Sequence, residues 1–279
     1  MQWYCQAMNI KSFFEANPVF RYEEFAAFMQ SHGIDRPASI RQQLSYHHKK
    51  GHLIHIRKFL YAVKPASIKE EDFWIDPYSI AGKASSDAVL AYHTALELLG
   101  LAYSSFDELV FLTARPAQLF SYAGQRFRPV IFPKALLNQN RGEYGIDTIK
   151  RQGTEVKLTG VERTIVDVLD RPDLGGGWEE VWRSLDNVIQ MDLDKLIEYT
   201  LLLKNATVVA KVGYFLEQRP SHLMVDQKYI QKLLPYIPKQ PHYMNRSRKE
   251  KGKYFEKWQL IIPLEIIERK WEEPNAEDI

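Results

Sequence analysis

The stretch that decides the fold of the N-terminal part is RPASIRQQLSYHHKKGHLIHIRKFLYAV, residues 36–63. Its first half predicts a helix that carries Pro37 in its first turn and ends at Gly51. The second half, residues 52–63, alternates in part and is rich in Ile, Leu, Phe, Tyr and Val. Such a run predicts a two-stranded ribbon.

Two shorter helices are expected before this stretch. The first has apolar residues at helical spacing from Ile10 and ends at Asn17-Pro18. The second runs from about Arg21 to His32. Three short helices followed by a hairpin form the element order of a winged helix-turn-helix, so we expect a domain of that type at residues 9–66.

The helix after Pro37 has one apolar and one polar side. On a wheel of ~100° per residue, Ile40, Leu44 and His47 fall together on one side. The outer and flanking side chains can bond to base edges and phosphates. The predicted DNA contacts of this helix are Arg36, Ser39, Arg41, Gln42, Ser45, Tyr46, Lys49 and Lys50. Arg57 and Lys58 are expected at the ribbon tip, where a wing contacts backbone or minor groove.

The charge distribution favours a polyanion as the partner of this domain. The net charge of the 279 residues is only +2, but residues 1–69 hold ten Lys/Arg and four Asp/Glu, which gives +6. No acid occurs from Arg36 through Lys69. We therefore expect binding to double-stranded DNA. The alternative is a solvated helix face on a protein-interaction module.

Metal binding is not expected at the histidines of this domain. His47, His48, His52 and His55 match no tetrahedral spacing and have no cysteine partner. Phosphate-facing or partly buried histidines explain the pattern better. No cofactor is expected either.

The rest of the composition indicates a cytoplasmic protein of two domains. The single cysteine, Cys5, cannot form an internal disulfide. No apolar run reaches the ~18–20 residues of a membrane-spanning helix. The first residues do not resemble a secretory signal. A length of 279 residues fits two domains better than one.

The second domain is predicted to be mixed, which makes the whole chain α+β. A helix is expected over residues 86–102, and β-rich runs over 108–159 predict a mainly antiparallel sheet. Helices return from Val161 onward. The expected domain map places an extension at 1–8, a linker at 67–81, the second domain at 82–265 and an acidic tail at 266–279.

A conspicuous polar group opens the helix that starts at Val161. Its members are Glu162, Arg163, Thr164 and Asp167. Arg163 and Asp167 stand at i, i+4 and can pair directly, and Glu162 is placed to cap the helix start. We expect a buried cluster that fixes this helix on the sheet; the alternative is a contact site for a toxin or nucleotide. His93 is likewise expected in a core hydrogen bond.

The rival hypothesis from another class is a Mg²⁺-dependent nuclease. Glu155-Val156-Lys157 is an acid-x-Lys step on an expected strand, as in restriction-type nucleases. An upstream acid is also required, for which Asp107, Glu108 and Asp147 are the candidates. No phosphate-binding loop, dinucleotide fingerprint, zinc-protease motif or nucleophile elbow accompanies this step. We therefore expect no enzyme activity.

A second basic run lies late in the chain. From Lys239 to Lys253 there are six bases and one acid, Glu250. It is either a second polyanion contact or a solvated loop. The bases proposed for this second contact are Arg246, Arg248, Lys249, Lys251 and Lys253.

The chain resembles the AbiEi family of antitoxins from type IV toxin–antitoxin pairs, over roughly residues 9–265. The most specific part is VKLTGVERTIVDVLDRPDLGGGWEEVWRSL, residues 156–185. The ribbon ending in KFLYAV, the AYHTALELLGL helix, RFRPVIF, VGYFLEQ and KWQLIIP occur in family order. One departure is Phe59, which stands where a glycine commonly precedes the final strand of the wing.

The resemblance implies a function as well as a fold. Such proteins repress their own promoters, with the winged helix on inverted repeats and co-operative association on the DNA. The C-terminal domain supports antitoxin activity against a toxin similar to nucleotidyltransferases. In a type IV pair the antitoxin need not form a stable complex with its toxin.

Overall fold

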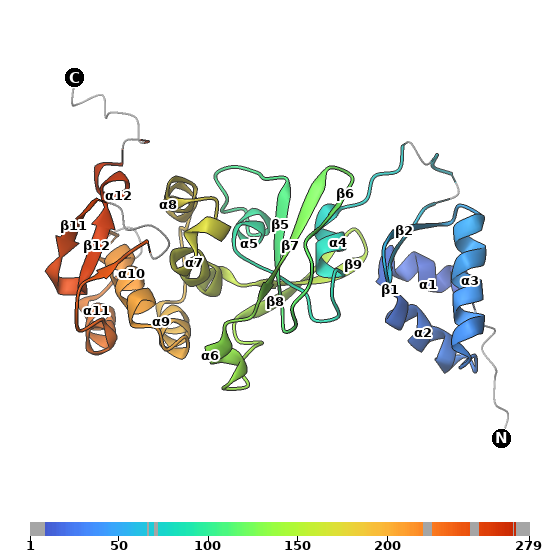
Figure 1. Cartoon of the computed structure of the whole chain (residues 1–279), viewed down its shortest axis with the longest axis horizontal. Coiled ribbons are helices and arrows are strands. Elements are labelled where there is room, and N and C mark those ends of the chain that lie inside the picture. The colour runs from blue at the N-terminus through green and yellow to red at the C-terminus, as the bar shows by residue number, and fades with distance from the viewer. Residues whose placement is uncertain are drawn as a thin grey trace.

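The described part of the chain has an α+β fold built around three sheets. The computed structural model describes residues 9–65, 67–69, 72–219, 225–245, 251–269 and 271. The expected N-terminal extension, residues 1–8, lies outside this part, as does most of the expected tail. The layers follow one another along the long axis in Figure 1, from the N-terminal helices through the central sheet to the C-terminal helices.

The N-terminal unit contains the three expected helices and the expected ribbon. The helices are α1 (Ile10–Ala16), α2 (Tyr22–Ser31) and α3 (Pro37–Lys49); the ribbon is β2 (Leu53–Arg57) and β3 (Leu60–Val63). A third strand, β1 (Val19–Arg21), pairs antiparallel with β3. Phe13, Phe14, Phe20 and Phe25 pack around Ile40 and Leu44 to form a small aromatic core.

The central sheet has six strands in the order β6-β7-β5-β4-β9-β8. They are β4 (Val89–Leu90), β5 (Glu108–Thr113), β6 (Phe120–Tyr122), β7 (Gln125–Ile131), β8 (Ile146–Arg151) and β9 (Thr154–Thr159). Three of its five strand pairs are antiparallel, so the sheet is mainly antiparallel as expected, but β4–β9 and β5–β7 are parallel, which makes it mixed.

Helices lie on one side of this sheet in more than one layer. They are α5 (His93–Leu98), α6 (Lys134–Leu137), α7 (Val161–Asp170), α8 (Trp178–Asp186), α9 (Leu193–Leu202), α10 (Ala206–Glu217) and α11 (Gln227–Leu233). Helices α9 and α10 pack on α7, and α11 packs on both α9 and α10. A small sheet of β10 (His242–Tyr243), β11 (Gly252–Phe255) and β12 (Leu260–Pro263) follows, with α12 (Leu264–Glu268) after it. Ile266 is buried in the core, so the expected tail begins inside α12.

The sheet separates two apolar cores because its side chains alternate. Val110 and Leu112 on β5 face the core formed with α7 to α10, whereas Leu109 and Phe111 face the N-terminal side. On that side Val19, Leu60 and Ala62 of the N-terminal sheet join the same cluster. The N-terminal unit is therefore packed on the sheet by a continuous apolar seam.

Two sequence-based expectations for residues 67–102 are wrong. The expected linker contains α4 (Pro77–Gly82), which is capped by Asp76 and buries Ile80 and Ala81 in the seam. The expected helix over 86–102 begins as a strand, β4, and becomes helical only at His93. The short apolar run before Tyr92 fits a buried helix and a buried strand equally well by its pattern. It forms a strand because its residues are buried on both faces of the sheet.

The seam leads to a test at Gly82. An added Cβ there would lie 2.5 Å from Cγ1 of Val156, so Gly82→Ala has to push α4 away from β9. We expect the free energy of unfolding to fall by about 1–3 kcal/mol, measured by chemical denaturation. Gly142→Ala is the control, because its Cβ would meet only Cδ2 of Leu137 at 3.7 Å. Equal stability of Gly82→Ala and wild type would contradict this packing.

Candidate nucleic-acid interface

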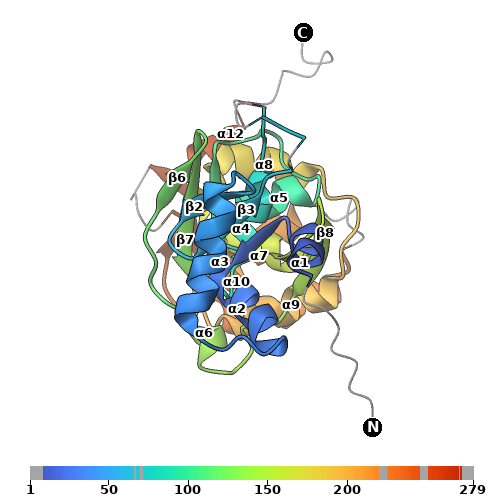
Figure 2. The ribbon, with the colours of Figure 1, turned by 90° about the vertical axis from the view of Figure 1, so that its right-hand side faces the viewer.

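Helix α3 lies at one end of the molecule with one side free. Pro37 opens the helix, and Ile40 and Leu44 bury its inner side in the aromatic core. Figure 1 places α3 at the edge farthest from the C-terminal helices, and Figure 2 looks directly onto it. The inner apolar pair thus fixes which side of α3 faces outward.

The structure places nearly all the predicted α3 contacts on that outer side. Ser39 is half-buried, and the others are exposed: Arg36, Arg41, Gln42, Ser45, Tyr46, Lys49 and Lys50. Tyr46 is 53% exposed, and the Lys50 Nζ lies 5.9 Å from its ring centroid. Within the part of the chain that the structure describes, no hydrogen bond or ion pair engages the side chains of Arg41, Gln42 or Lys49. Their donors are therefore available to a partner.

The ribbon tip differs from the sequence-based expectation. Arg57 does not project from a wing, because its guanidinium carbon lies 4.3 Å from the ring centroid of Phe120 on β6. Burial, followed by the charge of Arg21, lowers the pKa of Arg57. A cation over an aromatic face is stabilised there, so this side chain holds the ribbon on the central sheet. Lys58 is exposed, as expected.

The turn between β2 and β3 is tight. It contains only Lys58 and Phe59, and Phe59 has a φ of 68°, in the left-handed region that favours glycine. Phe59 is the residue that stands where a glycine commonly precedes the final strand of the wing. The backbone keeps the turn nonetheless, and the ring packs beside Tyr22 at 5.9 Å between centroids.

Of the histidines around the end of α3, His47 is half-buried, whereas His48 and His52 are exposed, and all three have a polar neighbour. Nδ1 of His47 lies 3.3 Å from Nδ1 of His52, and Nδ1 of His48 lies 2.9 Å from the Leu53 carbonyl oxygen. Burial, then the neighbouring His52, lowers the pKa of His47. Across the described ranges, no group of three or more His, Cys, Asp or Glu side chains is arranged to hold a metal ion.

The polar group on α7 forms a buried network. Arg163 is 1% exposed; its Nη1 donates to the carbonyl oxygens of Gly142 and Tyr144, and its Nε lies 3.5 Å from Oδ2 of Asp167. The Tyr199 hydroxyl donates to Oδ1 of Asp167 at 2.6 Å. Burial raises the pKa of Asp167 to about 6, although Arg163 and Tyr199 act against this. Arg163 thereby ties α7 to the loop before β8.

The other two residues of this polar group, Thr164 and Glu162, also bond to neighbouring elements of the fold. Thr164 bonds to the hydroxyl and carbonyl oxygens of Thr159 at the end of β9. Glu162 does not cap its own helix as expected; its Oε1 accepts from the backbone N–H of Asp192, which begins α9. Among the described residues, no side chain caps the start of α7.

His93 is bonded in the core as expected. Its Nε2 lies 3.1 Å from Oε1 of Glu180, which also accepts from the backbone N–H groups of Tyr103 and Ser104. Although burial acts to raise it, these hydrogen bonds lower the pKa of Glu180. This network fixes the loop before β5.

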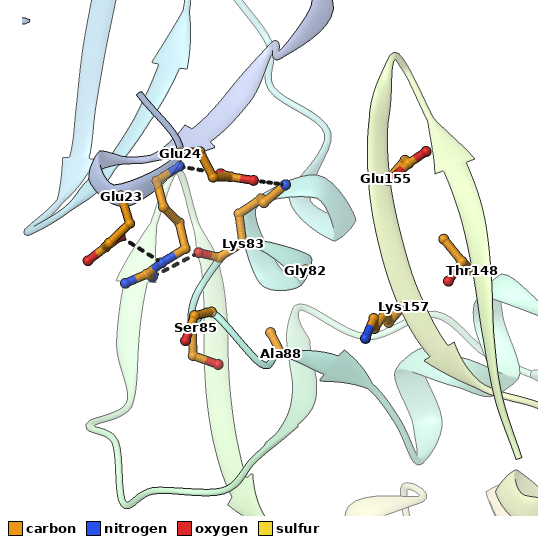
Figure 3. A pocket seen from close by; sticks show the side chains of 11 residues that line it. Glu23, Glu24, Gly82, Lys83, Ser85, Ala88, Thr148, Glu155 and Lys157 are labelled. Carbon is orange, nitrogen blue, oxygen red and sulfur yellow. Dashed lines mark hydrogen bonds and ion pairs between the residues drawn. The ribbon is translucent and has the colours of Figure 1, made fainter. Parts of the chain in front are cut away.

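The nuclease candidates Glu155 and Lys157 line a pocket of about 290 Å³ between the N-terminal unit and the sheet. Figure 3 shows Glu24 bonded to Lys83 on the opposite side of that pocket. The Nζ of Lys157 pairs with Oε1 of Glu143 at 3.1 Å. The pocket therefore carries mixed charge.

The predicted upstream acids are not brought to Glu155. Asp147 pairs in register with Leu158, so its side chain points to the other face of the sheet from Lys157. Glu108 bridges Arg126 and Arg128, and Asp107 accepts from Gln125. The predicted acids thus give the nuclease hypothesis no geometric support.

The second basic run is described only in part. Arg246, Arg248 and Lys249 lie outside the described residues, whereas Lys251 and Lys253 are exposed beside and on β11. Figure 1 places β11 at the opposite end of the molecule from α3. These two lysines therefore cannot extend the surface formed by α3.

Sequence reasoning missed the contacts that orient the N-terminal unit. Nη1 of Arg21 donates to the carbonyl oxygens of Lys83 and Ala84, and Nζ of Lys83 pairs with Glu24 at 2.5 Å. These partners stand about sixty positions apart, so no local pattern reveals them.

Comparisons with known proteins give a fold but no family. No family model matches the chain, and no curated protein matches it. It is similar to the crystal structure of the RV2827C protein from Mycobacterium tuberculosis, with 15% identity and a TM-score of 0.56, over 95% of this chain and 94% of that chain. At this identity the likeness concerns the fold alone.

None of the helices in the described ranges has the length and apolar character needed to cross a membrane.

The His47–His52 pair leads to a pH test. Because the pKa of His47 is lowered on folding, the unfolded state binds more protons below pH ~6.5, and stability falls as the pH drops through that range. We expect His52→Gln to make this decrease shallower between pH 7 and pH 5, in denaturation curves. His55→Gln, beside Tyr61, is the control and should follow wild type. Parallel curves for His52→Gln and wild type would show that the pair has no such effect.

Proposed function

We propose that this chain is a cytoplasmic DNA-binding antitoxin that represses its own promoter and counters a nucleotidyltransferase-like toxin. The observation that carries the proposal is the outer side of α3, where the side chains of Arg41, Gln42 and Lys49 are exposed without partners among the described residues. The element order α1-β1-α2-α3-β2-β3 supports a winged helix-turn-helix in which α3 is the recognition helix.

The dimensions of α3 suit a major groove. A helix with its side chains is ~10–12 Å wide and the groove is ~12 Å wide. The 13 residues of α3 give a length of ~20 Å, which allows its first turns to reach base edges while its end stays near a phosphate chain. The buried pair Ile40 and Leu44 holds this helix rigidly from behind.

The charge of the N-terminal part fits a phosphate backbone. Residues 1–69 carry +6, and no acid occurs between Arg36 and Lys69. A basic surface gives affinity through the release of counterions from DNA, and this contribution weakens as salt rises. Since Arg57 is held at Phe120, α3 supplies most of the contact.

The antitoxin part of the proposal rests on the AbiEi-like block at residues 156–185. Its most conspicuous residues, Arg163, Thr164 and Asp167, are buried and serve the fold. If the chain contacts a toxin, it does so through other residues of the C-terminal part. In pairs that act without a stable complex, no such contact is needed. Inverted repeats in the promoter would place two copies side by side.

The DNA-binding proposal leads to a charge test. Replacing Arg41 and Lys49 by Ala should weaken binding to the upstream DNA and reduce the magnitude of the log–log salt slope by ~1.8, for two lost phosphate contacts. Fluorescence anisotropy across a salt series measures both. Lys195→Ala with Lys228→Ala removes two exposed charges from α9 and α11 and is the matched control.

Two outcomes would contradict the proposal. One is an unchanged affinity and salt slope in the Arg41/Lys49 double variant. The other is an equal loss in the Lys195/Lys228 control, which would mean that net charge rather than α3 determines binding.

A further inference from the structure

The outermost row of α3 contains few side chains. Since Ile40 and Leu44 point inward, the wheel places Ala38, Gln42 and Lys49 directly opposite them. All three are exposed. Ala38 lies one turn before Gln42 and carries only a methyl group, so it leaves the space in front of the glutamine open.

The two adjacent glutamines differ in environment. Gln42 is exposed and has no hydrogen-bond partner among the described residues, whereas Gln43 is half-buried and turned toward the side of the helix. Only Gln42 therefore presents its whole amide outward. An amide offers one donor and one acceptor in a plane, which matches N6 and N7 of adenine and not the two acceptors of guanine.

The ribbon offers less to a DNA partner than α3, because of its two predicted contacts only Lys58 is exposed. Leu60 and Ala62 of β3 are buried in the seam, and Arg57 lies against Phe120. Figure 1 shows β1 and β2 between α3 and the central sheet, and β3 pairs between these two strands. We therefore assign the recognition of DNA bases to α3. Within α3 the residues of the first turns contact the bases, as in other helix-turn-helix proteins.

We propose that Gln42 specifies an adenine in each half-site by a two-point hydrogen bond in the major groove. This inference rests on the proposed function, because it presupposes that α3 enters DNA. Arg41 and Tyr46 flank Gln42 and contact the neighbouring positions. The expected half-site therefore contains one adenine whose replacement lowers affinity roughly 10- to 100-fold.

The experiment is binding-site selection with the full chain from a double-stranded library with a randomised core. Wild type should enrich a motif with an invariant adenine. Gln42→Glu should enrich the same motif with cytosine at that position, because a carboxylate accepts from the cytosine N4 amino group. Gln43→Glu adds the same charge one residue away and should keep the adenine. Thermal denaturation verifies that each variant is folded.

The outcomes separate the two proposals. If folded wild type enriches no sequence and binds no DNA, the proposed function is wrong. If it enriches a motif that Gln42→Glu leaves unchanged, or that Gln43→Glu changes instead, DNA binding stands and the assignment of Gln42 is overturned.

Discussion

The arrangement of this molecule depends on the apolar seam between its N-terminal sheet and its central sheet. Val19, Leu60 and Ala62 share one cluster with Ile80, Ala81 and Val156. Apolar burial is strong but not directional, so the orientation comes from polar contacts at its border, where Arg21 bonds to the carbonyl oxygens of Lys83 and Ala84. The seam holds the ribbon against the central sheet through Leu60 and Ala62 and leaves one side of α3 free.

The polar residues divide into two groups with different roles. Those that stand out in the sequence, Arg163, Asp167 and His93, are buried and hold helices and loops in place. A buried charge is costly unless it is paired, and Arg163 has carbonyl, carboxylate and aromatic neighbours. The residues suited to a partner are the less conspicuous ones on α3, whose donors face solvent.

The sequence predicts those features that depend on local patterns. The helical spacing from Ile10, Pro37 at a helix start and the β-rich run after Gly51 each lie within a few residues, and each element forms where expected. The exposed side of α3 follows from the same periodicity, so its predicted contacts are nearly all exposed.

Features that depend on distant partners could not be predicted. Strand β4 forms because it pairs with β5 and β9. Helix α4 forms where it packs against β9. The docking of Arg57 on Phe120 joins residues more than sixty positions apart, and it removes one predicted DNA contact. Tertiary context overrides local patterns in each case.

We propose that DNA lies against α3 while the ribbon stays on the central sheet. Photo-crosslinking with benzoylphenylalanine at position 46 or at position 59 compares two exposed aromatic positions on the same unit, because Tyr46 is 53% and Phe59 is 41% exposed. We expect crosslinks to upstream DNA from position 46 and none from position 59. Crosslinks from position 59 without any from position 46 would contradict it.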